Sequence, residues 1–289
     1  MQHFTITGFI NVPLQRSYRG DPDGNTLWLW KPDTNTQEVK QVLSPDSDLK
    51  IVKKGKAPYP YLKIRFEGMD TPETHFNGAR EGKPGTGGPW VKQNYGYLAR
   101  DQLFQLLGKD FEGTEKEQTV KLECRMIKGK RFYDSHKRVI GTVYLKDQSE
   151  SLNMQMVESG YAFPLLYDSM EQQDKKKISD LAQEAYNKDA GVWREYTVRP
   201  VDGVPPIPDN HHGEINDWGD VNFPKLWRRW ISYNYDPNGK PFETFVDWLA
   251  SLTDDKLAPG SKTERFSDAV SPHDYRLLVF PWDFIFHDE

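Results

Sequence analysis

The chain has 289 residues, of which 36% are hydrophobic and 13% aromatic, so it can bury a sizeable core in one large domain or two modest ones. This composition excludes a wholly disordered chain. A mean hydropathy of -0.79, without an apolar run of about 18 residues, excludes a membrane span. The first residues lack the basic and apolar regions of a signal peptide, and the single cysteine, Cys124, cannot form an internal disulfide, so we expect a cytoplasmic protein.

The formal net charge of -5 argues at first against a nucleic-acid partner, but it is the sum of two unlike parts. Residues 1–200 hold 30 Lys/Arg and 27 Asp/Glu, whereas residues 201–289 hold 8 and 16. Within the first part, the segment 121–146 carries eight basic and two acidic residues. A basic face of this kind can follow a phosphate backbone, although a solvated strand pair with lysines on its open face has the same pattern.

The predicted elements follow one another as several strands, a helix, two more strands and two further helices. Hydrophobic alternation and turn signals predict strands at Phe4–Val12, Thr26–Trp30, Tyr61–Met69, Thr119–Ile127 and Arg138–Leu145. Apolar residues at helical spacing predict helices at Trp90–Leu107, Leu152–Glu158 and Met170–Lys188. Short strands with few helices favour a small barrel closed by helices, and a five-stranded barrel of the oligonucleotide-binding type is one candidate.

Two further segments divide the chain. Residues 32–60 are polar and are expected to be an insertion into a domain that spans residues 1–200. Residues 201–215 are expected to be a linker, because the prolines at 205, 206 and 208 bar helix and central strand. The expected fold class is therefore α+β, mainly β, followed by a mostly helical extension.

The C-terminal module, residues 216–289, is expected to be folded because residues 201–289 hold five of the nine tryptophans. Amphipathic helices are expected at Phe223–Trp230 and Phe242–Leu252, and Tyr275–Phe286 is strongly apolar. The sequence leaves open whether this module packs on the barrel, forms a homodimer or binds a protein partner.

A run of residues that suits phosphodiester hydrolysis lies at the strand Tyr61–Met69. Arg65 is inside this strand, Asp70 is at its end, and a proline turns Glu73 into the following loop; Arg138 begins a second strand-like segment. A carboxylate can bind a hard cation or orient water, and forked guanidiniums match the charge of a phosphoryl transition state. The acidic run can also be a helix start, and the arginines can also be partners in structural salt bridges. The spacing of these residues does not decide between the structural and the catalytic interpretation.

In this order, the residues resemble the staphylococcal (micrococcal) nuclease, or thermonuclease, family. Arg65 with Asp70-Thr71-Pro72-Glu73 looks like the family's Arg-x4-Asp-Thr-Pro-Glu motif, and Arg138 falls where the family has its second catalytic arginine. Residues 152–162 are similar to its helix ending in Gly-x-Ala, and residues 181–193 resemble its last helix. The resemblance implies a five-stranded oligonucleotide-binding barrel with packed helices, and Ca2+-dependent cleavage of DNA and RNA that leaves 3′-phosphate ends.

The resemblance also implies a role for each matching residue. Glu73 would be the general base or the group that orients water, and Arg65 and Arg138 would clamp the phosphate. Asp70 and the carbonyl of Thr71 would bind the metal ion.

The sequence departs from the family's pattern at Asn25, where the family usually has an aspartate that binds the metal ion. An amide oxygen carries no charge, so we expect a weaker or altered metal site, helped by Asp21 or Asp23, or a divalent cation other than Ca2+. His136 stands where an aromatic side chain often approaches the nucleotide. We expect His136 and Tyr167 to contact the substrate, with Tyr167 or Phe163 supplying stacking in place of an aromatic at position 136; a core role is the alternative for each of these aromatic side chains.

The sequence therefore predicts a metal-dependent nuclease that acts on DNA, RNA or both. The alternative is a catalytically weakened barrel that binds nucleic acid or protein, with the C-terminal module mediating a protein interaction. Because that module is acidic, we also hypothesise that it restrains the nuclease by competing for the basic groove.

Overall fold

The computed structural model describes most of the folded elements and many of the connections between them. The described residues are 3–10, 24–33, 61–77, 90–108, 118–125, 133–134, 136–196, 217–218, 222–234, 242–273, 275 and 277–288. Three predictions therefore lie outside the described residues: most of the insertion at 32–60, the linker at 201–215, and the help that Asp21 or Asp23 gives to a metal site.

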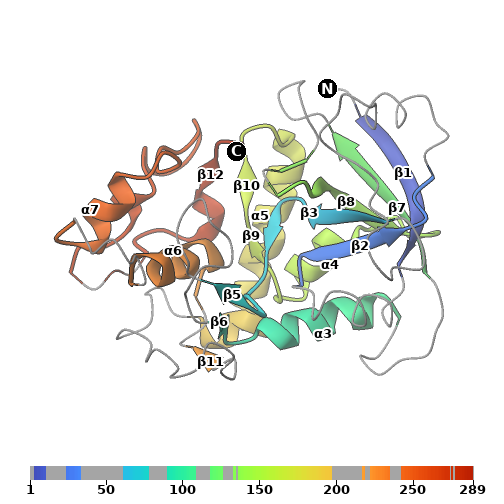
Figure 1. The fold of residues 1–289 in the computed structure, drawn as a ribbon, viewed down its shortest axis with the longest axis horizontal. Helices are drawn as coiled ribbons and strands as arrows, with labels where there is room; N and C mark the ends of the chain where they lie inside the picture. Colours follow the sequence, from blue (N-terminus) through green and yellow to red (C-terminus); the bar gives the residue numbers. More distant parts are fainter. Residues whose placement is uncertain are drawn as a thin grey trace.

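Five of the strands close into a barrel. In order around it they are β1 (His3–Ile10), β2 (Thr26–Trp30), β3 (Tyr61–Phe66), β8 (Val139–Leu145) and β7 (Gln118–Arg125). β3 and β8 run parallel, and the other neighbouring pairs run antiparallel. This is the five-stranded barrel with helices that the sequence predicts, and Figure 1 shows it on the right of the molecule.

The alternation of side chains explains which face of each strand is buried. Along β8, buried and half-buried residues alternate over the whole strand, as expected when one face covers a core. β2 is buried on both faces, because Trp28 and Trp30 pack with Phe9 and Tyr61 in a cluster separate from the main core.

The strand predicted at Tyr61–Met69 is divided by a turn. β3 ends early, Gly68 takes a positive φ of 76°, and β4 (Met69–Asp70) pairs with β9 (Phe163–Pro164) instead of continuing the barrel. Glycine adopts this left-handed conformation at little cost, so the chain can turn here. Arg65 and Asp70 of the predicted motif therefore belong to two different ladders.

The helix predicted at Trp90–Leu107 starts later than expected. Its first residues form β6 (Trp90–Gln93), which pairs with β5 (Phe76–Asn77) and with β11 (Asp217–Trp218). The helix α3 then spans Gly96–Leu106. Pairing with two strands that are distant in sequence decides the conformation of this segment, and the local spacing of apolar residues does not.

Two further helices lie where the sequence predicts them. α4 (Leu152–Glu158) is capped by Ser151, whose hydroxyl accepts a hydrogen bond from the Met154 amide at 3.2 Å. α5 (Gln172–Asn187) buries its apolar face and is followed by the 3-10 helix η1 (Gly191–Glu195). Of the helices described, none combines the length and the apolar character needed to cross a membrane.

The C-terminal region packs on the barrel domain, which is one of the three arrangements that the sequence left open. Its described helices and last strand are α6 (Pro224–Asn234), α7 (Phe245–Ala250), η2 (Ser267–Ala269), η3 (Pro281–Asp283) and β12 (Ile285–Phe286). β12 pairs in parallel with β10 (Leu166–Tyr167) of the barrel domain. One continuous core includes residues of both regions, and Figure 1 shows α6 between β5 and α7.

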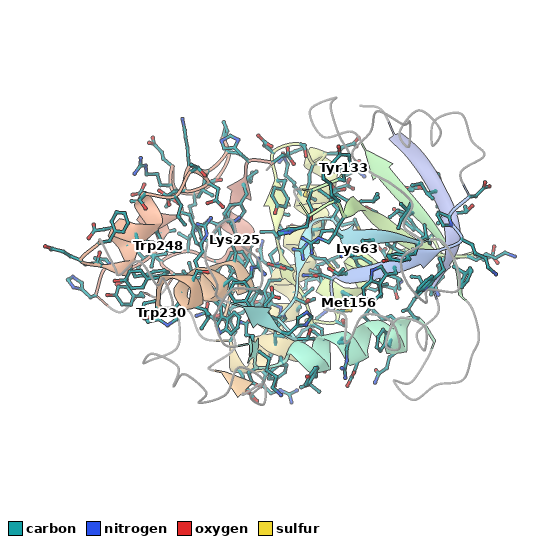
Figure 2. The ribbon with its side chains drawn as sticks, in the orientation of Figure 1. Lys63, Tyr133, Met156, Lys225, Trp230 and Trp248 are labelled. Atoms are coloured by element: carbon teal, nitrogen blue, oxygen red, sulfur yellow. The ribbon has the colours of Figure 1, made fainter. Side chains whose placement is uncertain are left out.

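Aromatic rings fill much of the C-terminal region. Trp230 packs edge-on against Phe245 with ring centroids 5.0 Å apart, and Phe245 stacks on Trp248 at 6.0 Å. Figure 2 shows Trp230 and Trp248 on the side away from the barrel, with Lys225 closer to the centre of the molecule. The region is therefore folded, as its tryptophan content predicts.

Candidate functional site

The strand register brings the two predicted arginines to the same edge of the barrel. Thr26 on β2 lies opposite Arg65 on β3, and Arg65 lies opposite Ile140 on β8. Arg138 directly precedes β8, so it enters the barrel beside the same pair of strands. Two guanidiniums that are distant in sequence thereby become neighbours of Thr26.

Asp70 ends β4, and Glu73 lies in the short irregular segment that follows it. Residues 71–75 form no helix, so the interpretation of this run as a helix start is wrong. The carbonyl of Glu73 accepts a hydrogen bond from the Gln93 amide at 2.9 Å and lies against Gly96, where a Cβ atom would collide with it. The end of β6 and the start of α3 therefore fix the backbone of Glu73.

Asp70 is fully buried, and both of its carboxylate oxygens accept hydrogen bonds. Asn25 Nδ2 and Arg65 Nη2 donate to Oδ1 at 2.7 and 2.8 Å. Arg228 Nη2 donates to Oδ2 at 2.7 Å, and Arg228 Nη1 donates to Glu73 Oε1. The predicted residues Asn25, Arg65, Asp70 and Glu73 thus meet in one network, together with a guanidinium, that of Arg228, which the sequence did not predict.

Arg228 lies on α6, and the packing of this helix fixes its position. Its neighbour Trp227 is fully buried and contacts Phe76 of β5 with ring centroids 5.8 Å apart. Just before the helix, the carbonyl of Asn222 accepts a hydrogen bond from Gln93 Nε2 at 2.6 Å. The barrel domain therefore holds both the start of α6 and the residue next to Arg228.

The sequence contains only a weak signal for this contact. Arg228 and Arg229 are adjacent basic residues on an amphipathic helix within an acidic region. Their side chains diverge, since Arg229 binds Asp254 within the C-terminal region while Arg228 reaches the barrel domain. Nothing in the spacing of the two arginines shows which of them points toward the site.

Arg138 completes the network on its other side. Its backbone amide and its Nε donate to the two carboxylate oxygens of Asp134 at 2.9 and 2.7 Å, so the turn before β8 orients the guanidinium. Arg138 Nη1 donates to Thr26 Oγ1 at 3.2 Å, and the Thr26 hydroxyl donates to Asn25 Oδ1 at 3.1 Å. A continuous chain of hydrogen bonds therefore joins Arg138 to Asp70.

The charges around Asp70 decide its protonation. Burial by itself raises the pKa of Asp70, but the charges of Arg228 and Arg65 outweigh burial and lower this pKa to about 2. Burial also opposes the charge of Arg228, yet Asp70 and Glu73 raise the pKa of Arg228 above its ordinary value. The buried carboxylate and both guanidiniums are therefore charged at neutral pH.

The arginines lie closer to solvent than the buried carboxylate does. The side chains of Arg65, Arg138 and Arg228 are 14%, 22% and 24% exposed, whereas Asp70 is 0% exposed. An anion that approaches this edge of the barrel therefore meets guanidinium groups before it meets the carboxylate of Asp70. The site is suited to hold a phosphate group.

The remaining predicted residues lie around this network. His136 is exposed in the turn before Arg138, and its amide donates to Asp134 at 2.9 Å. Tyr167 is half-buried on β10. Burial lowers the pKa of the Arg65 guanidinium, but the neighbouring groups Asp70 and then Tyr167 raise this pKa above its ordinary value. Thr71 is fully buried, and its hydroxyl has no hydrogen-bond partner within the described part of the chain.

The predicted metal ligands do not offer a set of free oxygens. Ca2+ takes about six to eight oxygen ligands at about 2.3–2.6 Å. Both oxygens of Asp70 instead face N–H donors, and Asn25 turns its amide nitrogen toward Asp70. No group of three or more His, Cys, Asp and Glu side chains that can hold a metal ion occurs among the described residues. The arrangement therefore does not fit a divalent cation at Asp70.

The fold and the site define a closed five-stranded mixed barrel with arginines and carboxylates gathered at its edge. Residues 63–195 match the family model described as Staphylococcal nuclease homologue, so this part of the chain is a staphylococcal nuclease domain, as the resemblance implies. The match covers Arg65, Asp70, Glu73 and Arg138, and it includes neither Asn25 nor Arg228. Members of this family typically depend on Ca2+, and the family implies a nucleic-acid substrate. A comparison with curated proteins gave no match.

Proposed function

We propose that the chain is a nuclease that hydrolyses phosphodiester bonds of DNA, RNA or both at this edge of the barrel. The observation that carries the proposal is the network that gathers Arg65, Arg138 and Glu73 from three separate segments. The family match supports it, because the matched domain contains all three residues.

Arg65 and Arg138 are proposed to bind the phosphate. Within the described part of the chain, Arg65 uses only Nη2, on Asp70, and Arg138 uses Nε and Nη1. Because a guanidinium has five N–H groups, each side chain keeps donors for two phosphoryl oxygens. These donors also neutralise the negative charge that builds up on the phosphoryl oxygens in the transition state.

Glu73 is proposed to orient the attacking water. Its backbone is fixed by β6 and α3, and its carboxylate is fixed by Arg228. Because Arg228 already donates to this carboxylate, we assign Glu73 the role of orienting the water rather than that of deprotonating it fully. The oxygen of water bonds to phosphorus, the bond from phosphorus to the 5′ oxygen breaks, and a proton from the water passes to the departing 5′ oxygen, which leaves as a hydroxyl, so the product carries a 3′-phosphate.

No step of this mechanism uses a metal ion. The Ca2+ of the family would need Asp70, the Thr71 carbonyl and Asn25 as oxygen ligands, and the described arrangement of these residues does not fit it. The work of neutralising charge is therefore assigned to the arginines of the chain itself.

A barrel that binds nucleic acid without cleaving it is the second candidate function. The observation that favours it is the bond from Arg228 to Glu73, which holds the carboxylate that would otherwise act on water. Cleavage and binding are therefore measured separately.

The test is incubation of the full chain with end-labelled single-stranded DNA, duplex DNA and RNA, in EDTA and with Ca2+, Mg2+ or Mn2+. We expect 3′-phosphate products, and a rate at least about 100-fold lower in Glu73→Gln and Arg138→Lys. The matched control is Arg265→Lys, since Arg265 is 55% exposed in the C-terminal region. Binding without cleavage under all conditions supports the second candidate, and an unchanged rate in Glu73→Gln contradicts the assigned role.

A further inference from the structure

The two carboxylates of the site already have a cation bound to them, the Arg228 guanidinium. We propose that Arg228 is a built-in replacement for a divalent metal ion, so that Arg65, Arg138 and Arg228 together bind the phosphodiester backbone without a metal. This inference rests on the proposed function, because the anion in question is the phosphate of a nucleic acid.

Among the described residues, the charges of the site are paired without a metal ion. There, the guanidiniums of Arg65, Arg138 and Arg228 form ion pairs with the carboxylates of Asp70, Asp134 and Glu73. A divalent cation would enter a site whose negative charges are already paired. The guanidiniums of Arg228 and Arg65, which bind the Asp70 carboxylate at 2.7 and 2.8 Å, would repel a divalent cation there.

Asn25 suits a site whose cation is a guanidinium. Its Nδ2 donates to Asp70 at 2.7 Å, which an aspartate at this position cannot do. A carboxylate there would face Asp70 with like charge, whereas the amide satisfies an oxygen of Asp70 and accepts from Thr26 through its own oxygen. The neutral side chain of Asn25 and the guanidinium of Arg228 therefore both donate hydrogen bonds to Asp70, where the family's metal ion would need an oxygen ligand.

The packing of α6 makes Arg228 a permanent part of the site. Trp227 and Phe223 are fully buried, and Phe223 contacts Phe163 of β9 with ring centroids 6.2 Å apart. Withdrawal of the helix would open this core, and withdrawal of the side chain alone would leave the buried carboxylate of Asp70 with fewer partners. We therefore do not expect a metal ion to displace the Arg228 side chain from Asp70 and Glu73.

Arg228 also remains within reach of a substrate. It uses Nη1 and Nη2 on the two carboxylates, and its side chain is partly exposed beside Arg65. A phosphate held by Arg65 therefore lies close to a second guanidinium that shares Asp70 with it. This geometry makes Arg228 a substrate-binding residue as well as a charge partner of the acids.

The first test is a calorimetric titration of the unaltered chain with Ca2+. We expect no binding up to about 1 mM, which is the weak end of the range for protein Ca2+ sites. In the double variant Asn25→Asp/Arg228→Ala, which adds a carboxylate and removes the guanidinium, we expect binding at or below about 1 mM. Binding tighter than this by the unaltered chain overturns the proposal even if the double variant fails to fold.

The second test is the binding of a fluorescent oligonucleotide with a phosphorothioate backbone, measured by anisotropy in EDTA at fixed salt. We expect equal affinity with EDTA and with Ca2+, and an affinity at least about 10-fold lower in Arg228→Gln. The controls are Arg265→Gln on the surface and Arg229→Gln, the next residue on α6, which binds Asp254. An equal loss in Arg229→Gln, or binding that requires Ca2+, overturns the proposal.

The two tests separate this inference from the proposed function. If the unaltered chain binds and cleaves no nucleic acid under any condition, the proposed function fails. The calorimetric titration still decides whether Arg228 excludes Ca2+ from Asp70 and Glu73.

Discussion

Arg228 donates a hydrogen bond of 2.7 Å to Asp70, a residue 158 positions earlier in the chain. The contact joins the C-terminal region to the part that matches the staphylococcal nuclease homologue family. The charges in this contact are the reverse of those in the restraint hypothesised from the sequence. There, acidic residues of the C-terminal region would bind a basic groove, whereas here a basic residue of that region binds acidic residues of the barrel domain. The C-terminal region thus supplies the site with a cation.

Removal of the Arg228 guanidinium is expected to destabilise the whole chain. In Arg228→Met, Asp70 keeps Arg65 and Asn25, but both Asp70 and Glu73 lose the guanidinium of Arg228, and a broken buried ion pair costs about 3–5 kcal/mol. The free energy of unfolding from urea titration measures this loss. Arg265→Lys, which keeps the positive charge beside Asp255 at an exposed position, should change it by no more than about 0.5 kcal/mol, and a similar small change in Arg228→Met would contradict the assigned contact.

The stability of the unaltered chain is expected to fall in acid. The folded pKa of Asp70 lies near 2, below the ordinary value of 3.8, so its contribution is present above pH 4 and is lost as the pH falls toward 2. The shift corresponds to roughly 2 kcal/mol. In Arg228→Met the shift is smaller, so the difference in unfolding free energy between the two chains should be larger at pH 6 than at pH 2.5. A difference that does not change with pH would contradict this account.

The forked shape of Arg65 is expected to matter more than its charge. In Arg65→Lys the positive charge beside Asp70 remains, but the planar pair of donors for two phosphoryl oxygens is lost. We expect kcat/KM to fall at least about 10-fold, with little change in the thermal midpoint of unfolding. Equal kcat/KM in Arg65→Lys and in the control Arg265→Lys would show that Arg65 does not bind the phosphate.

The barrel and the C-terminal region are expected to unfold together. Trp227 is fully buried against Phe76, so Trp227→Ala should cost about 3–5 kcal/mol. Because the core is continuous, circular dichroism and tryptophan fluorescence should report one coincident urea transition in the variant and in the unaltered chain. Two separate transitions would contradict a shared core. For the same reason, point variants of α6 are sharper probes of the site than deletion of residues 201–289.

The barrel and most of the candidate site could be predicted from the sequence because their signals are local. Strand alternation marks β3 and β8, β-prone residues after a turn signal mark β2, and the run from Arg65 to Glu73 is contiguous. Arg138 could be placed near it only through the resemblance, since the pairing of β3 with β8 is a long-range contact.

Other features could not be predicted because they depend on tertiary pairing. The segment Trp90–Gln93 has helical spacing but forms a strand, since β5 and β11 pair with it. Arg228 and Arg229 are equivalent in the sequence, and only the packing of α6 turns one toward Asp70 and the other toward Asp254. The resemblance indicated Asn25 as a weakened metal ligand, and in the structure its amide donates to Asp70.

Whether the site works without a metal ion is tested most directly by the cleavage rate of one end-labelled single-stranded oligonucleotide by the unaltered chain, measured in EDTA and again in Ca2+. We predict cleavage in EDTA at a rate within about two-fold of the rate in Ca2+, because three arginines already supply the positive charge at the site. Cleavage that occurs only with Ca2+ would contradict it.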